Sequence, residues 1–281
     1  MEKVLTAVTD LEFYLMEGFW AASGDPRVGR FFFMTSFRLP LALLVLYLLS
    51  VYLLAPLLVR GRHHLHPHNT PRKCEPPKWH LHLYNLSMTA FSGYIVYHNV
   101  LHYQTLLRAI LDVHPPSNYL DTSAGTTGLL QQLYLFLLSR YAHLLKPVLA
   151  ILRRRPVSNS AIYGAFSMAC FGWMHYRCAG SVLPLLAAAG ALLPLYDCAH
   201  HCYALLADLR PELQFNFSLK VLLMKMQLVA WFLLALHLLY YALMLAVYCL
   251  QVASVANLML YGGNVAVYLT LFAYDFFMPN L

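Results

Sequence analysis

The sequence is poor in charged side chains. Only 11% of its 281 residues are charged, whereas soluble domains have about a quarter. Hydrophobic residues make up 60% of the chain and the mean hydropathy is +0.57, so we predict an integral membrane protein. The net charge of +7 lies mostly in short segments between apolar runs. Because no basic tail or nucleic-acid motif accompanies it, we interpret this charge as orienting helices in a bilayer.

A cleavable signal peptide and a disulfide framework are also missing. Acidic residues at Glu2, Asp10, Glu12 and Glu17 interrupt any apolar core that a signal peptide would need. We therefore expect residues 1–38 to form an amphipathic arm on the lumenal or external side. The six cysteines show no regular spacing, so they neither predict nor exclude disulfides.

What the chain has in abundance is long apolar runs. Seven of them reach the roughly 20 residues that a helix needs to cross a bilayer. They lie near 39–59, 81–102, 127–152, 157–175, 181–206, 219–240 and 247–274. We predict an all-α protein with one seven-helix transmembrane domain over 39–275 and a short cytosolic tail over 276–281. The Gly125 to Gly128 stretch and the Pro115-Pro116 pair are expected to lie in loops.

Positive charge distinguishes the two sides of the predicted bundle. The loops after the first, third and fifth runs carry Lys and Arg clusters, for example at Arg153, Arg154 and Arg155. Because positively charged loops stay on the cytosolic side, we expect a lumenal N-terminus and a cytosolic C-terminus.

Several short motifs occur in a characteristic order. They are Asp25-Pro-Arg-Val28, Phe33-Met-Thr-Ser36, Tyr84-Asn-Leu-Ser87, Leu152-Arg-Arg-Arg155 with Val157-Ser158, and later Gln227 and His237. Together with the seven-run layout, this ordered set resembles the ELO family of very-long-chain fatty acid elongases. The resemblance covers nearly the whole chain, although no single motif is specific.

The resemblance implies a fold and a reaction. Six helices would surround a tunnel for an acyl chain, in a protein of the endoplasmic reticulum. Such enzymes condense malonyl-CoA with acyl-CoA to give a 3-ketoacyl-CoA, carbon dioxide and free CoA. A histidine box, H-x-x-H-H, would supply nucleophile and base, and imidazole suits both roles because its ordinary pKa is near 6.5.

The residues at the expected position of this box differ from the family's pattern. When the arginine cluster is placed on the family's segment, the three histidines fall on Ala161, Gly164 and Ala165. Alanine and glycine carry no group that can hold a proton or an acyl chain, so we expect no catalysis there. Upstream, the family's K-x-x-E-x-x-D-T pattern falls on Arg140, His143 and Lys146, followed by Pro147.

Other polar residues remain within the apolar runs, where they are candidates for function. Arg140 lies at mid-depth, and we expect it to pair with Asp197 inside the bundle. Lys146 and Lys225 lie near the cytosolic ends of their runs, and for these two we favour simple snorkelling to the interface over a role in binding an anionic group. The predicted ligand-binding set is Arg140, His143, Lys146, Lys225, Gln227 and His237.

The segment Asp197-Cys-Ala-His-His-Cys202 offers replacement acid and base groups. Helical spacing places Asp197 beside His201 and Cys198 beside Cys202. We favour a hydrogen-bonded network over a metal site, and expect no metal or cofactor. His143, Asp197, His200 and His201 are then the fallback catalytic candidates.

Three functions remain open. The first is a catalytically degenerate elongase-like protein that binds lipid, acyl-CoA or partner membrane proteins, as a homo- or hetero-oligomer. The second is an active elongase that uses the fallback residues. The third is a seven-helix receptor or transporter, which lacks supporting motifs.

Overall fold

The computed structural model describes residues 27–54, 57, 79–111, 124–153, 157–177 and 179–209, with isolated positions 221, 222, 225, 263, 266, 267 and 270. All regular structure in these ranges is helical, which confirms the predicted all-α class. The short elements are η2 (Val28–Arg30), η3 (Phe32–Met34) and η4 (Ser50–Leu54). The helices are α2 (Arg38–Leu49), α4 (Trp79–Leu101), α5 (Tyr103–Leu111), α6 (Ala124–His143), α7 (Leu145–Leu152), α8 (Asn159–Arg177) and α9 (Ala179–Leu209).

The first five predicted runs each coincide with described helices. Among the described residues, one helical stretch, Thr127–Leu152, is long and apolar enough to cross a membrane, and it matches the predicted run 127–152. Two shorter apolar helices, Arg38–Leu53 and Ala161–Met174, fall within the first and fourth runs. The runs 219–240 and 247–274 lie outside the described residues, apart from isolated positions.

Two features differ from the sequence-based expectations. Gly125 to Gly128, expected in a loop, belong to the first turns of α6. A helical glycine costs only about 1 kcal/mol, and the packing of Leu129, Leu130 and Leu133 outweighs that cost. The amphipathic helix α5 was not predicted, and only His102 separates it from α4.

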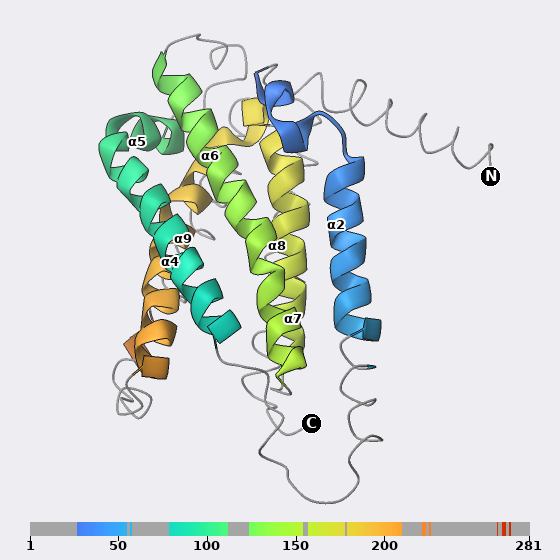
Figure 1. Cartoon of the computed structure of the whole chain (residues 1–281). Helices are drawn as coiled ribbons and strands as arrows, with labels where there is room; N and C mark the ends of the chain where they lie inside the picture. Colours follow the sequence, from blue (N-terminus) through green and yellow to red (C-terminus); the bar gives the residue numbers. More distant parts are fainter. Residues whose placement is uncertain are drawn as a thin grey trace, which may run out of the picture.

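The helices form a bundle in which α2, α8 and α6 stand side by side, while α4 and α9 pack along each other beside α6 (Figure 1). The helical stretch formed by α6 and α7 is interrupted at Leu144. Pro147 has no backbone N–H and its ring crowds the carbonyl of residue 143, which breaks the helical hydrogen-bond ladder. The Leu144 N–H instead bonds the Tyr141 carbonyl at 3.1 Å. This break ends α6 at His143.

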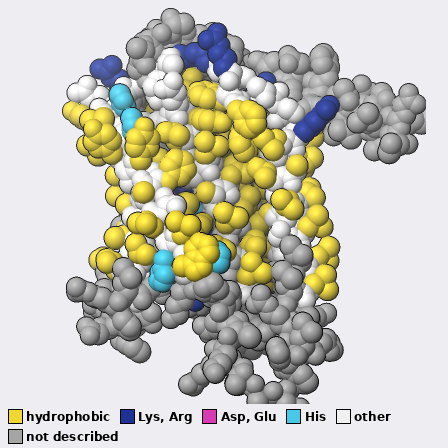
Figure 2. All heavy atoms as spheres, viewed as in Figure 1, with side chains coloured by type: hydrophobic (Ala, Val, Ile, Leu, Met, Phe, Trp, Pro, Cys, Tyr) yellow, Lys and Arg dark blue, Asp and Glu magenta, His cyan; other side chains and the backbone are white. Residues whose placement is uncertain are grey.

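The exterior of the bundle is apolar and its interior holds polar groups. Large hydrophobic side chains are exposed along α2 and α4, among them Leu46 at 59%, Leu83 at 55% and Leu86 at 54%. On the face shown in Figure 2, hydrophobic side chains form a broad band. The buried polar and charged residues are Asn85, Ser92, Asn99, Gln132, Ser139, Arg140, Ser167, Asp197 and His201. Such an arrangement suits a protein whose outer surface meets lipid.

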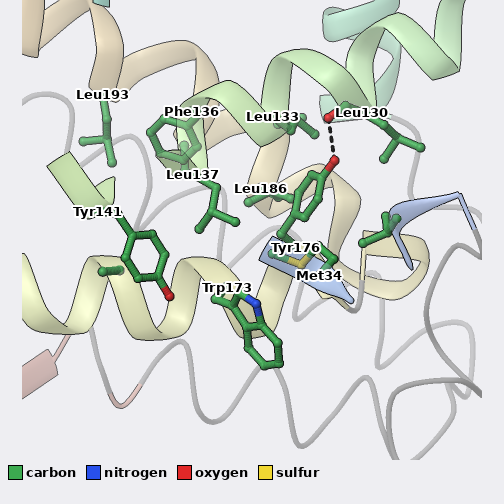
Figure 3. Close-up of a cluster of buried hydrophobic side chains, with 14 of the residues drawn as sticks. Met34, Leu130, Leu133, Phe136, Leu137, Tyr141, Trp173, Tyr176, Leu186 and Leu193 are labelled. Atoms are coloured by element: carbon green, nitrogen blue, oxygen red, sulfur yellow. Dashed lines mark hydrogen bonds between the residues drawn. The ribbon is translucent and has the colours of Figure 1, made fainter. Parts of the chain in front are cut away.

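The hydrophobic core joins α6 and α8 to the short elements before α2 (Figure 3). The Tyr176 hydroxyl donates to the Leu130 carbonyl at 2.7 Å. The Trp173 indole N–H donates to the Phe33 carbonyl at 2.8 Å.

Val28 and Met34 are fully buried, so residues 28–34 of the segment assigned to the N-terminal arm pack into the bundle.

Candidate functional site

A buried ion pair joins α6 to α9. The Arg140 guanidinium bonds the Asp197 carboxylate, and each side chain is 8% exposed. The Arg140 Nε and Nη2 atoms also donate to the Ser139 hydroxyl, both at 3.2 Å, and its guanidinium lies 4.9 Å from the Phe136 ring centroid. The structure thus confirms the predicted pairing of Arg140 with Asp197.

His143 lies on the same side of α6 as Arg140, about one helical turn further on. Its Nε2 atom is 3.4 Å from Asp197 Oδ2, which is within ion-pair distance. Its ring centroid is 5.2 Å from that of His201 on α9. Asp197 is therefore flanked by two nitrogen groups from α6 and balances the charge of Arg140.

The His201 side chain is held in one orientation by α4. Its Nδ1 atom lies 3.0 Å from Asn85 Oδ1. Because an amide oxygen can only accept, Nδ1 must carry the proton, and in the neutral ring Nε2 then keeps a lone pair. His201 is fully buried, and Nε2 has no hydrogen-bond partner among the described residues. The Tyr84 hydroxyl has none either, and its ring contacts the His201 ring edge-on at 5.4 Å.

His200 points to a different set of neighbours. Lys146 Nζ lies 2.8 Å from His200 Nε2, and Tyr196 Oη lies 3.4 Å from His200 Nδ1. Because an ammonium group can only donate, His200 Nε2 accepts and the ring is held as the Nδ1–H tautomer. Lys146 itself is exposed, so this pair extends the buried cluster toward the bundle surface.

Some of the predicted site residues lie together in one cluster, and others lie outside it. Five of them converge between α4, α6 and α9, namely Arg140, His143, Asp197, His200 and His201. Lys146 of α7 joins this cluster through His200. Lys225 is helical and exposed, and no described contact connects it to this cluster. Gln227 and His237 lie outside the described residues.

The position expected for the histidine box lies elsewhere. Ala161, Gly164 and Ala165 are in the first two turns of α8, with Ala161 exposed and Gly164 buried. The carbonyl of Ile162, between them, accepts a hydrogen bond from the Tyr47 hydroxyl of α2 at 3.0 Å. This part of α8 thus packs against α2, whereas the polar cluster lies between α4, α6 and α9.

Two contributors to the cluster were not predicted as site residues. Tyr84 and Asn85 belong to a motif that was noted only as a family landmark. A signal was present, because Asn85, Ser92 and Asn99 recur at seven-residue spacing and therefore share one face of α4. All three are buried.

Cysteine and histidine groups in the described ranges do not gather into a metal site. In these residues, no three His, Cys, Asp or Glu side chains are placed so as to hold a metal ion. Cys198 and Cys202 are free thiols, and Cys198 Sγ lies 3.8 Å from the Thr89 carbonyl.

Comparison with known families decides the class of the protein. The ELO family model, GNS1/SUR4, matches residues 32–280. The chain belongs to the ELO family. ELO proteins are multi-pass membrane proteins of the endoplasmic reticulum, and typical members are 3-ketoacyl-CoA synthases of fatty acid elongation. A search of curated proteins found no match.

This match confirms the resemblance drawn from the ordered motifs. It also supports an elongase-like function related to fatty acids, and the apolar Thr127–Leu152 helix is compatible with a membrane location. It gives no support to an unrelated receptor or transporter.

Proposed function

We propose that this ELO protein binds an acyl chain or acyl-CoA within its helix bundle and does not carry out condensation at the position of the family's histidine box. The observation that carries the proposal is the composition of the start of α8. Ala161, Gly164 and Ala165 occupy the positions where the box is expected, and none has an ionisable side chain. Acyl transfer needs a nucleophile and decarboxylation needs charge stabilisation, and neither group can come from these residues.

The charged residues of the cluster support the binding of acyl-CoA or lipid. Asp197 neutralises Arg140, so among the buried described residues no cation is left without a counter-ion. Lys146 is exposed at the edge of the cluster, where an ammonium group can bind phosphate groups of CoA or a lipid head group. The apolar helices around it would accommodate the chain.

A condensation assay with a parallel binding measurement tests the proposal. Purified full-length protein would be incubated with labelled malonyl-CoA and acyl-CoAs of several lengths, and acyl-CoA binding measured on the same preparation. We expect saturable binding that weakens in Lys146→Met, and no 3-ketoacyl-CoA above the level without protein. Turnover with any acyl-CoA would overturn the non-catalytic part, and absence of saturable binding would overturn the binding part.

One observation favours a second candidate, an active elongase with relocated catalytic groups. His143, Asp197, His200 and His201 meet in one cluster, and His201 presents an oriented, unprotonated Nε2. An imidazole held by a hydrogen bond at one nitrogen can act as nucleophile or base at the other.

The same assay separates the two candidates. If the second is right, product forms in the wild-type protein and is lost in His201→Ala, while His98→Ala, outside the cluster, leaves it unchanged. If the first candidate is right, the wild-type protein forms no 3-ketoacyl-CoA, and neither variant changes that result.

A further inference from the structure

A second buried polar site lies deeper in the bundle, away from the ion pair. It consists of Gln132 on α6 and Asn99 on α4, which are 4% and 8% exposed. Both polar atoms of the Gln132 side chain and Oδ1 of Asn99 have no hydrogen-bond partner among the described residues. Leaving buried polar atoms unpaired is unfavourable, so native proteins seldom do so without a ligand or water to satisfy them.

Both residues lie at the level of Gly190 of α9, Asn99 through a hydrogen bond of its own and Gln132 through its chain neighbour Leu133. Asn99 Nδ2 donates to the Gly190 carbonyl at 3.0 Å. A Cβ atom on Gly190 would lie 2.8 Å from Leu133 Cδ2, and Leu133 directly follows Gln132. The absence of a side chain at Gly190 lets α9 approach α4 and α6 closely here. These three helices also lie together in Figure 1.

This site is distinct from the cluster around Asp197. Gln132 precedes His143 by about three turns, or roughly 16 Å along α6. Gly190 precedes His201 by the same distance along α9, so the two sites stand at different depths. Gln132 lies on the same face of α6 as Phe136, Arg140 and His143, because these positions recur at helical spacing.

The unpaired atoms define the chemistry of a ligand. Gln132 offers one amide donor and one carbonyl acceptor, and Asn99 offers a second carbonyl acceptor. Arg140 and Asp197 are the buried charged residues in the described ranges, and they neutralise each other about two turns away, so a charged group would find no counter-ion. A plain alkyl chain would leave all three polar atoms unpaired. A hydroxyl group fits, because it donates to a carbonyl oxygen and accepts from the Gln132 amide.

We propose that the Gln132–Asn99 site binds a hydroxyl group on an aliphatic lipid, which makes a hydroxylated acyl chain the preferred ligand. This rests on the proposed function, since it takes the bound lipid for granted and specifies its class. The two carboxamides would bind a hydroxyl substituent at a fixed distance along the acyl chain. The polar end of the lipid would lie at the cluster around Asp197.

A matched pair of glutamines provides the test. Gln132→Leu removes the buried carboxamide, and Gln131→Leu makes the same change at the neighbouring exposed position. Binding of octadecanoic acid would be compared with a positional series of its monohydroxy derivatives, using the wild-type full-length protein and both variants. Thermal unfolding without ligand would check that Gln132→Leu is folded, which we expect because it removes an unpaired buried group.

We expect the wild-type protein to prefer at least one hydroxy derivative about tenfold over the plain chain, equivalent to about 1.4 kcal/mol. Gln132→Leu should abolish this preference while keeping affinity for the plain chain, and Gln131→Leu should retain it. Equal binding of hydroxylated and plain chains by the wild type would overturn the inference, as expected if only an ordered water fills the site, yet leave the proposed function standing. If the wild type binds neither free chain, the inference is overturned, and the acyl-CoA binding measurement described above decides the proposed function separately.

Discussion

At the scale of single residues, the Arg140–Asp197 pair dominates the interior. Taking two charges out of water costs several kcal/mol each, and only their mutual attraction and added hydrogen bonds offset that cost. Arg140 gains bonds to Ser139 and a contact with Phe136, and Asp197 gains His143 as a second neighbour. The pair is therefore stable as a unit, whereas either partner alone would be a buried, uncompensated charge.

Single and double replacement of this pair should consequently differ. We expect Arg140→Leu or Asp197→Leu to lower the free energy of unfolding by about 3–5 kcal/mol, because each leaves one buried charge unpaired. The double variant should lose much less than the sum, since two apolar residues replace the pair. Unfolding in detergent micelles, followed as a double-mutant cycle, would measure this. Additive losses would show that the two side chains do not interact.

Some contacts of single residues could be predicted from the sequence and others could not. The depth of Arg140 within an apolar run and the presence of a carboxylate at Asp197 were enough to predict their pairing. The bond from His201 to Asn85 was not predicted, because it joins residues 116 positions apart and depends on how α4 packs against α9. Helix periodicity places a residue on a face but does not say which helix that face meets.

At the scale of elements, the close approach of α9 to α6 depends on Gly190. A Cβ there would lie 2.8 Å from Leu133 Cδ2, and Leu133 is 1% exposed, so it has little room to move. Gly93 on α4 offers a contrast, because a Cβ at that position would meet only Cys198 Sγ at 3.7 Å, an ordinary contact distance.

Substitution of these two helical glycines should therefore change the melting temperature differently. Both Gly190→Ala and Gly93→Ala gain up to about 1 kcal/mol from helix propensity. Gly190→Ala also overpacks the α6–α9 contact, which costs typically 1–3 kcal/mol. We expect Gly93→Ala to raise the melting temperature or leave it unchanged, and Gly190→Ala to lower it. Equal melting temperatures would mean that the bundle is looser at Gly190 than the structure shows.

Element boundaries were predictable in part. Apolar length predicted five of the described helical regions, because a run of about 20 apolar residues has few alternatives to a helix in a membrane. The break at Leu144 follows from Pro147, which the sequence displays, but the start of α6 at Ala124 was missed since Gly125 and Gly128 were interpreted as turn residues. Helix propensity is a weak indicator where tertiary packing holds the segment.

At the scale of the whole molecule, the apolar exterior and polar interior indicate a lipid-facing bundle. Leu46 is 59% exposed on α2, and all the buried polar residues except Ser167 of α8 lie on α4, α6 and α9. In water this distribution would leave a large hydrophobic surface uncovered.

A charge introduced on this exterior should oppose membrane insertion. We expect Leu46→Arg to reduce insertion of the α2 segment by about 2.5–3.5 kcal/mol, the cost of an arginine near the centre of a membrane helix. Gln104→Arg, on the exposed side of α5, serves as the control and should insert normally. Membrane integration of the two full-length variants can be compared by alkaline extraction and by tags whose glycosylation reports the side on which each loop lies. Equal insertion would argue that α2 does not face lipid.

The same tags would test the predicted topology of seven spans with a lumenal N-terminus and a cytosolic C-terminus. The family supports a multi-pass protein of the endoplasmic reticulum, but the orientation follows only from the Lys and Arg clusters in the sequence. A glycosylated tag after residue 281 would contradict it.

The most direct test of the central claim is to measure condensation and acyl-CoA binding by the same purified, full-length protein. We predict saturable binding of acyl-CoA with no formation of 3-ketoacyl-CoA from malonyl-CoA, because Ala161, Gly164 and Ala165 supply no catalytic group. Sustained production of 3-ketoacyl-CoA that disappears in His201→Ala would contradict this claim and assign the chemistry to the cluster between α4, α6 and α9.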